Sequence, residues 1–169
     1  MLTPAIPIDE QERLAALHRL DILDTPYEDA YDRITETACE EFGVDVSMIT
    51  LVDSDRQWFK AIHGVEIRES ERYLSICAHT ILHEECFVIP NGFIDSRFSD
   101  HPLVKDGPKF CFYAGCPIHD PTGYRIGAFC IIHTAPREFD CTDHAKLTAL
   151  AKIVERQIAN DYGVKSHVN

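Results

Sequence analysis

The sequence lacks any excess of positive charge. Lys and Arg total 16 against 28 Asp and Glu, which gives a formal net charge of -12 over 169 residues. No stretch gathers the basic residues into a face that would bind phosphates. We therefore expect no nucleic-acid partner, and anionic membrane surfaces should repel this chain rather than recruit it.

Long apolar runs are also absent. The opening MLTPAIPIDE is too short and too broken by proline for a secretory signal, and no 18 apolar residues follow one another. We therefore expect a cytoplasmic protein without a membrane segment. Internal repeats and low-complexity linkers are missing too, and 45% of the residues are hydrophobic. This predicts a single domain over 1–169, with a core at about 9–160 and a frayed tail at 161–169.

The seven cysteines do not show the C-x-x-C spacing that zinc sites and dithiol motifs favour. Their number is odd, and most of them lie inside apolar stretches. We predict that most are reduced and buried, where they pack like small apolar side chains.

Helical periodicity appears at both ends of the chain. Apolar residues recur at helical spacing between 9 and 23, and a second helix is predicted from Thr25, as its N-cap, to Gly43. A third helix is predicted from Thr142 to about 160. Its apolar stripe is narrow and close to heptad spacing, and it consists of Leu147, Leu150, Ala151, Val154 and Ile158.

The middle of the chain is typical of strands. Residues 44–63 contain VDVSMITLVD and QWFKAIH around a DSDR turn, which predicts an antiparallel hairpin. A short helix is predicted from Ser75, as its cap, to His83, followed by a brief strand in CFVIP. A second hairpin is predicted where KFCFYAGCPIH and YRIGAFCIIH flank DPTG.

Both faces of this second hairpin are apolar. Strand alternation places Phe110, Phe112 and Ile118 on one face, and Tyr113 and Pro117 on the other. A sheet with one face in water would instead alternate apolar and polar residues. We therefore expect helices to cover one face, and loops or a ligand to cover the other. The order of the elements, with helices at both ends of an antiparallel sheet, indicates an α+β fold.

Six stretches together resemble the GAF domain family, in particular bacterial GAF modules that stand alone or precede signalling outputs. They are ERLAALHRLDILDTPYEDAYDRIT, SMITLVDSDRQWFKAIHGV, LSICAHTIL, IDSRFSDHPLV, FYAGCPI and GYRIGAFCII, in family order over roughly 10–160. The resemblance implies a six-stranded antiparallel sheet. It also implies that the terminal helices pack on one face and that a ligand pocket, roofed by the short helix and loops, lies on the other.

The resemblance also suggests which residues contact a ligand. SICAHTIL would form the roof of the pocket, and FYAGCPI with GAFCII its floor. This chain departs from the usual family pattern with His133, where Asp is common, and with Cys116, where Ala is commoner. The candidate ligand-binding residues are Trp58, Phe59, Ser75, Cys77, His79, Asp95, Phe98, Tyr113, Cys116 and Cys130.

The residues of the roof segment allow three more specific chemistries. Cys77, His79 and His83 could hold a metal, but their spacing matches no established zinc pattern, and packing within the roof is the simpler reading. A bilin could attach at Cys77, as it does in related photosensory domains, although no other part of that signature is present. Cys77, Cys111 and Cys116 could support thiol catalysis, but alternation sends 111 and 116 to opposite faces.

These observations favour a sensory or regulatory module over an enzyme. They predict a small-molecule ligand but identify neither that ligand nor any cofactor. The signal would leave by protein contact, most simply through a homodimer built on helices 9–23 and 142–160. Docking of the same apolar stripe on the sheet is the alternative. A thiol-dependent reductase of free methionine sulfoxide, and a scaffold that has lost its ligand, are the other hypotheses.

Overall fold

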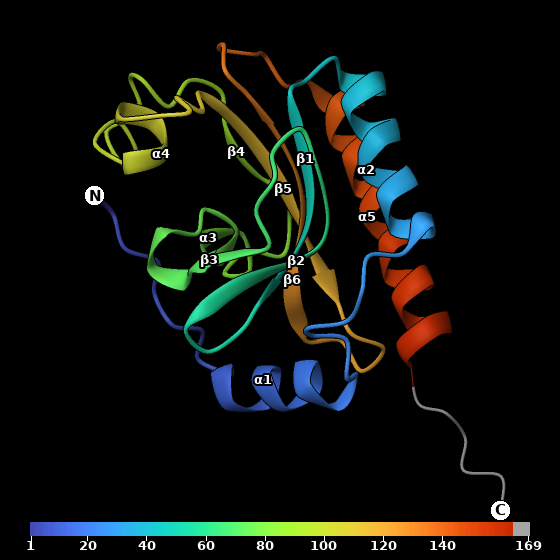
Figure 1. Ribbon diagram of the computed structural model, residues 1–169. Helices are drawn as coiled ribbons and strands as arrows, with labels where there is room; N and C mark the ends of the chain where they lie inside the picture. The colour runs from blue at the N-terminus through green and yellow to red at the C-terminus, as the bar shows by residue number, and fades with distance from the viewer. Residues whose placement is uncertain (164–169) are drawn as a thin grey trace, which may run out of the picture.

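The computed structural model describes residues 1–163 and shows an α+β fold built on one six-stranded sheet (Figure 1). The strand order is β3-β2-β1-β6-β5-β4, and every neighbouring pair is antiparallel. The strands are β1 (Val46–Val52), β2 (Arg56–His63), β3 (Glu69–Glu71), β4 (Phe87–Ile89), β5 (Phe112–His119) and β6 (Arg125–His133). Both predicted hairpins are therefore present. No sequence pattern predicted β3, a three-residue edge strand with two exposed glutamates.

Two helices cover one face of this sheet. These are α2 (Asp29–Phe42) and α5 (Cys141–Tyr162), which lie side by side in Figure 1. The predicted stripe on α5 docks here, because Leu147, Val154 and Ile158 are fully buried in the core between the helices and the sheet. The residues that motivated a helix-mediated dimer are thus already used within the chain. The helix also runs to Tyr162, two residues into the predicted tail, whose residues 164–169 lie outside the described part.

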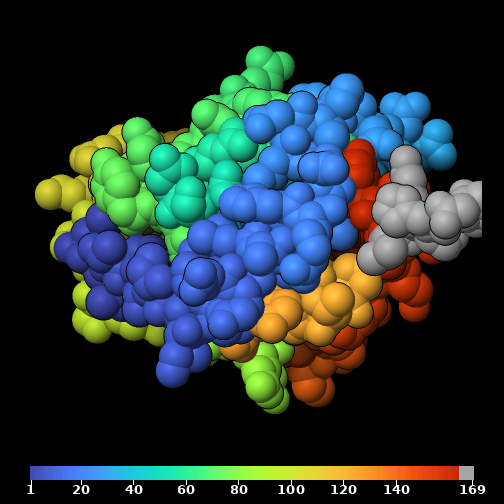
Figure 2. Space-filling model, turned by 90° about the horizontal axis from the view of Figure 1, so that it is seen from below, coloured from blue at the N-terminus to red at the C-terminus, as the bar shows by residue number. Residues whose placement is uncertain are grey.

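Helix α1 (Glu10–Arg19) lies across the end of the sheet rather than flat on its face. Figure 2 shows the N-terminal segment and α1 in blue, covering this end of the molecule beside the orange hairpin of β5 and β6. Ala16 and Leu17 of α1 are buried. From this position α1 contacts the end of β1, where Arg13 bonds to the Val52 carbonyl and His18 lies 2.8 Å from Asp53.

The predicted N-caps of the second and third helices were wrong. The hydroxyl of Thr25 donates a hydrogen bond to the Ile22 carbonyl at 2.6 Å, and α2 begins only at Asp29. Helix α5 is capped by Asp140, whose carboxylate accepts a hydrogen bond from the Asp143 amide at 2.9 Å. The Asp143 carboxylate in turn accepts a hydrogen bond from the Asp140 amide at 3.1 Å, so the cap of a reciprocal capping box lies two residues before Thr142.

The opposite face of the sheet is covered by short elements. These are η1 (Arg72–Leu74), α3 (Cys77–Thr80) and α4 (Pro102–Lys105), which Figure 1 places away from α2 and α5. A second buried apolar cluster fills the space beneath them. The expectation that both faces of the sheet are covered is therefore confirmed. Phe110 belongs to this second cluster rather than to the face of Phe112, because regular strand alternation begins only at Phe112.

Within residues 1–163, none of the helices has the length and apolar content needed to span a membrane.

Candidate functional site

The short helix α3 forms a roof over strands β1, β5 and β6, and Ser75 fixes where it begins. The Ser75 hydroxyl accepts a hydrogen bond from the Ala78 amide at 3.0 Å, as a capping hydroxyl does. The helix itself has Ile76 as its N-cap and ends at Thr80, not at the predicted His83. The same hydroxyl donates to Gln57 Oε1 on β2 at 2.6 Å. Because both bonds are buried, the start of the roof is held on the sheet by polar contacts as well as by packing.

Beneath α3, two thiols and two hydroxyls form a buried polar group. Cys77 Sγ lies 3.7 Å from Cys130 Sγ, and the Tyr113 hydroxyl donates to Cys77 Sγ at 3.2 Å. Thr80 Oγ1 is 2.7 Å from the same Tyr113 oxygen. Cys77 and Thr80 come from the roof, whereas Tyr113 and Cys130 come from β5 and β6. Roof and floor therefore meet through sulfur and oxygen atoms rather than through hydrocarbon alone.

The thiols of this group are not equivalent. The hydrogen bond from Cys130 lowers the pKa of Cys77, against the effect of burial, and the Tyr113 hydroxyl adds to the lowering. The same hydrogen bond, together with burial, raises the pKa of Cys130 well above its ordinary value. Burial and the neighbouring Cys77 raise the pKa of Tyr113 in the same way. Of the two thiols, Cys77 therefore has the lower pKa.

An aromatic layer continues the roof toward the edge strand β4. The His79 ring packs edge-on against Phe98 at a centroid distance of 5.1 Å, and it stacks over Phe87 at 6.2 Å. The Arg97 guanidinium lies over Phe87 and Phe98, where Asp95 holds it through hydrogen bonds of 2.8 and 3.0 Å. Burial lowers the pKa of His79, so its imidazole is neutral at pH 7.

The structure brings most of the predicted site residues together. On the roof side of the sheet lie Phe59, Ser75, Cys77, His79, Phe98, Tyr113 and Cys130, with Asp95 at the margin. Trp58 and Cys116 instead point to the helix side, in the core with α2 and α5. Alternation explains both outcomes. Trp58 is adjacent to Phe59, and Cys116 shares the parity of Phe112.

The space beneath the roof is filled by these side chains. Cys77 is 3% exposed, Tyr113 is 2% exposed, and Cys130 and Phe98 are fully buried. A small molecule would therefore have to displace part of the roof. Open grooves lie elsewhere. One of about 700 Å³ lies between α2 and the segment after β2, and one of about 610 Å³ lies at the start of α5.

Within residues 1–163, no three His, Cys, Asp or Glu side chains gather in a way that could hold a metal ion. Cys77 and His79 of the suggested metal set contact Cys130 and Phe98, respectively, and His83 stacks on Phe87 at 5.2 Å.

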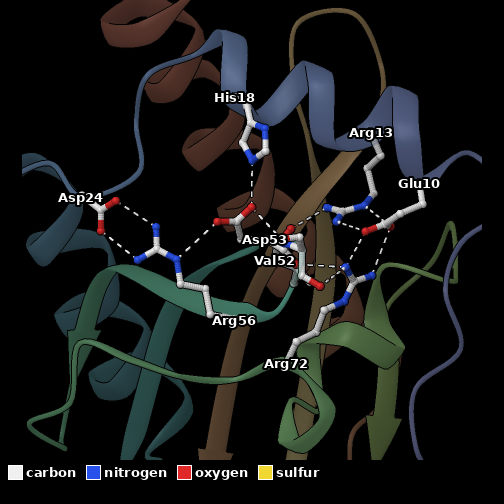
Figure 3. Close-up of polar contacts among 9 residues, drawn as sticks. Glu10, Arg13, His18, Asp24, Val52, Asp53, Arg56 and Arg72 are labelled. Carbon is white, nitrogen blue, oxygen red and sulfur yellow. Dashed lines mark hydrogen bonds and ion pairs between the residues drawn. The ribbon is translucent and has the colours of Figure 1, made fainter.

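Sequence reasoning missed a polar network that joins α1 to the start of the roof (Figure 3). The Glu10 carboxylate accepts hydrogen bonds from Arg13 at 2.9 and 3.1 Å, and also from both terminal nitrogens of Arg72. Arg13 additionally donates to the Val52 carbonyl at 2.7 Å, and Arg72 to the Asp53 carbonyl at 2.9 Å. Both arginines are at least nine-tenths buried. The sequence did carry one signal: Arg13 falls on the apolar stripe that continues with Leu17 and Leu20.

The same network extends to the turn between β1 and β2. The Asp53 carboxylate is 2.8 Å from His18 Nε2 and accepts a hydrogen bond from Arg56 Nε at 3.3 Å. Arg56 also pairs with both oxygens of Asp24 at 2.8 Å (Figure 3). Helix α1, the connection to α2, the β1–β2 turn and η1 are therefore joined by one set of charged contacts.

The sheet order, the helix layer and the covered opposite face match the α+β fold that the sequence suggested. The model of the GAF domain family matches residues 26–159, which is most of the chain. The chain belongs to the GAF domain family.

Three similar proteins give this assignment context. A cyclic di-GMP phosphodiesterase of Pseudomonas aeruginosa is 34% identical over 159 residues, covering 94% of this chain and 27% of that protein. The chain thus spans about a quarter of this curated relative. The GAF domain of an Acinetobacter phosphoenolpyruvate-protein phosphotransferase has a TM-score of 0.64 at 19% identity, covering 88% and 94% of the two chains. A free methionine-R-sulfoxide reductase of Neisseria meningitidis has a TM-score of 0.65 at 17% identity, covering 95% and 96%. The two structural likenesses show a shared fold.

Proposed function

We propose that this chain is a cytoplasmic sensory or regulatory module, which binds a small molecule beneath α3 and passes its state to a signalling partner by protein contact. The observation that carries the proposal is the buried group of Cys77, Cys130, Tyr113 and Thr80 between roof and sheet. Buried polar atoms cost free energy unless they are hydrogen-bonded. A polar ligand could take the place of one of their present hydrogen-bond partners. A helix of only four residues covers them, so a ligand would have to displace one short element rather than a long helix.

The polar network of Figure 3 supplies a route for the signal. Arg72 lies three residues before Ser75 and contacts Glu10 on α1, so displacement of the roof would act on the two buried arginines. Helix α1 would then shift against the end of the sheet. This is a physical connection between two elements, and its coupling is measurable by paired substitutions.

The partner is proposed from the relative of 34% identity. That protein is named a cyclic di-GMP phosphodiesterase, and the matched segment makes up 27% of it. A cyclic di-GMP signalling domain is therefore the first partner to test. The contact could be made with such a domain on a second protein, or between two copies of this chain. The exposed faces of α2 and α5 and the surface of α1 are the contact regions available for it.

The proposal is tested by native mass spectrometry of the freshly purified chain, followed by thermal unfolding with cyclic GMP, cyclic AMP, methionine sulfoxide and an aromatic amino acid. A compound at a hundred times its Kd should add about 2.7 kcal/mol to the free energy of unfolding. Thr80→Val should reduce that gain, because it removes a hydroxyl at the site. Cys39→Ala, a buried cysteine on the helix side, is the matched control and should keep it. A chain that carries no small molecule and responds to none of these compounds would contradict the proposal.

A second candidate, a thiol-dependent reductase of free methionine sulfoxide, is favoured by the close pair of thiols. The Cys77 thiolate would attack the sulfoxide sulfur, and Cys130 at 3.7 Å would then form a disulfide with it, with release of methionine and water. An external dithiol would restore both thiols. Turnover of methionine-R-sulfoxide with dithiothreitol, lost in Cys77→Ser, would establish this reaction. A lack of turnover in the unaltered chain would exclude it.

A further inference from the structure

A second sulfur site lies on the helix side of the sheet, away from the roof. The groove of about 610 Å³ at the start of α5 is lined by residues 84–86, by β5 and by the N-terminal half of α5. Cys86, Cys116 and Cys141 all border it. Cys86 and Cys116 form a disulfide, and Cys141 is a free, exposed thiol. Sequence reasoning assigned Cys116 to the ligand pocket and did not identify this bond.

The register of β4 and β5 places the two cysteines opposite each other. Phe87 of β4 lies opposite Gly115 of β5, so Cys86 and Cys116 are the next opposed pair along the antiparallel ladder. Strand β4 has only three residues and pairs with β5 alone, at the edge of the sheet. The disulfide is therefore the one covalent tie on a strand with few backbone hydrogen bonds.

The two sulfur atoms differ in access. Both lie near the Thr148 hydroxyl of α5, at 3.5 Å from Cys86 Sγ and 3.9 Å from Cys116 Sγ. Cys86 is partly exposed at the groove, whereas Cys116 is 3% exposed. Cys86 is therefore the more accessible residue of the pair, and we expect a small thiol that enters the groove to attack its sulfur first.

We propose that Cys86–Cys116 is a reversible redox site, which a peptidic monothiol of the glutathione class reduces through this groove. The reductant thiolate attacks Cys86 Sγ, the bond between the two protein sulfurs breaks, and Cys116 leaves as a thiolate that takes up a proton. A second reductant thiolate attacks the reductant sulfur of the mixed disulfide and frees Cys86. Two electrons pass to the protein, and the reductant leaves as its own disulfide. Disulfides in reducing compartments are usually transient and redox-sensing, which fits the cytoplasmic location proposed above.

The redox state would reach the roof through β4. Phe87, the residue after Cys86, stacks against His83 and His79 and lies under Arg97. Loss of the covalent tie frees the start of β4 and therefore loosens this aromatic layer. The chemistry of the disulfide does not depend on the proposed function, whereas its effect on the roof deepens that function.

Alkylation of the native full chain tests the redox chemistry. Iodoacetamide followed by peptide mass spectrometry should label Cys141 and leave Cys86 and Cys116 unlabelled, so Cys141 serves as the internal control for reagent access. After incubation with millimolar glutathione under native conditions, Cys86 should gain label directly, and both Cys86 and Cys116 should gain label when alkylation follows in denaturant. Labelling of the pair before reduction, or no labelling after it, would overturn the proposal.

Two matched variants test the direction of attack. In Cys116→Ser, glutathione disulfide should form an adduct at Cys86 at least tenfold faster than it does at Cys116 in Cys86→Ser. Equal rates would contradict attack through the groove. Hydrogen exchange of residues 81–90 in the unaltered chain should accelerate on the order of tenfold on reduction. Unchanged exchange would refute the link to the roof. None of these measurements requires a ligand, so their failure is distinguishable from failure of the binding proposal.

Discussion

Replacement of Glu10 by glutamine should destabilise the chain, because a single carboxylate neutralises two buried arginines. Arg13 and Arg72 have side chains that are 1% and 6% exposed, and each keeps only carbonyl acceptors once the carboxylate charge is gone. Breaking a buried ion pair costs about 3–5 kcal/mol. The Glu10 side chain is itself 17% exposed, so we expect the lower end, about 3 kcal/mol. For a domain of this size the loss corresponds to a fall in Tm of about 6–12 °C.

The pH dependence gives an independent check. Burial acts to raise the pKa of Glu10, but hydrogen bonds from Arg72 and Arg13 outweigh it and lower the pKa below its ordinary value. A lowered pKa in the folded state stabilises the fold fully above the unfolded-state pKa of about 4.3, and this contribution is lost as the pH falls through the folded-state pKa. The difference between the unaltered chain and Glu10→Gln should therefore be constant near neutral pH and shrink in acid.

Denaturant unfolding at pH 7 measures the effect, and Glu12→Gln is the matched control. Glu12 lies on the same helix and is exposed, so its substitution should change the free energy of unfolding by less than about 0.5 kcal/mol. Hydrogen exchange at residues 72–81 should accelerate in Glu10→Gln and not in Glu12→Gln. If the two variants are equally stable, the carboxylate does not hold the arginines, and the proposed route from roof to α1 is wrong.

Four further substitutions have defined expectations. Lys60→Met should lower the free energy of unfolding by about 2 kcal/mol in denaturant titrations, because the fully buried ammonium donates three hydrogen bonds at 2.8–2.9 Å. Gly127→Ala should cost about 3 kcal/mol or prevent folding, since an added Cβ would lie 1.9 Å from a backbone oxygen of β1. Gly43→Ala, at a φ of +62° with open space around it, should cost only about 1 kcal/mol by the same titration. Replacing both Cys86 and Cys116 by alanine should lower the free energy of unfolding by about 2–4 kcal/mol relative to the oxidised chain. Relative to the reduced chain, the loss should be far smaller.

Part of the candidate site could be predicted from local sequence patterns. Ser75 was identified as a cap from its place before the roof helix, and the structure shows its hydroxyl bonded to the Ala78 amide. Cys77 and His79 lie in the roof because a short helix follows that cap. Cys116 was predicted to lie in the pocket because the family resemblance treated the whole FYAGCPI segment as pocket floor. Alternation puts Cys116 on the face of Phe112, and only the structure shows that this is the helix side.

The binding partners of other residues could not have been identified without tertiary contacts. Arg13 and Lys60 look like surface residues by composition, yet each is buried. Their acceptors lie far along the chain. Arg13 bonds to the carbonyl of Val52, and Lys60 reaches the hydroxyls of Thr25 and Tyr162. A buried charge is tolerated only where such acceptors converge on it, and convergence depends on which elements pack together.

The sequence by itself determined the type of fold and the coverage of both sheet faces, because the period of apolar residues fixes which elements form and which of their sides avoid water. The tertiary structure alone decided the partners. The thiol of Cys77 meets Cys130, and Cys86 meets Cys116, because those contacts follow from strand order, register and the seat of the roof helix. Such pairings join residues 30 or more positions apart, and local periodicity holds no information about them.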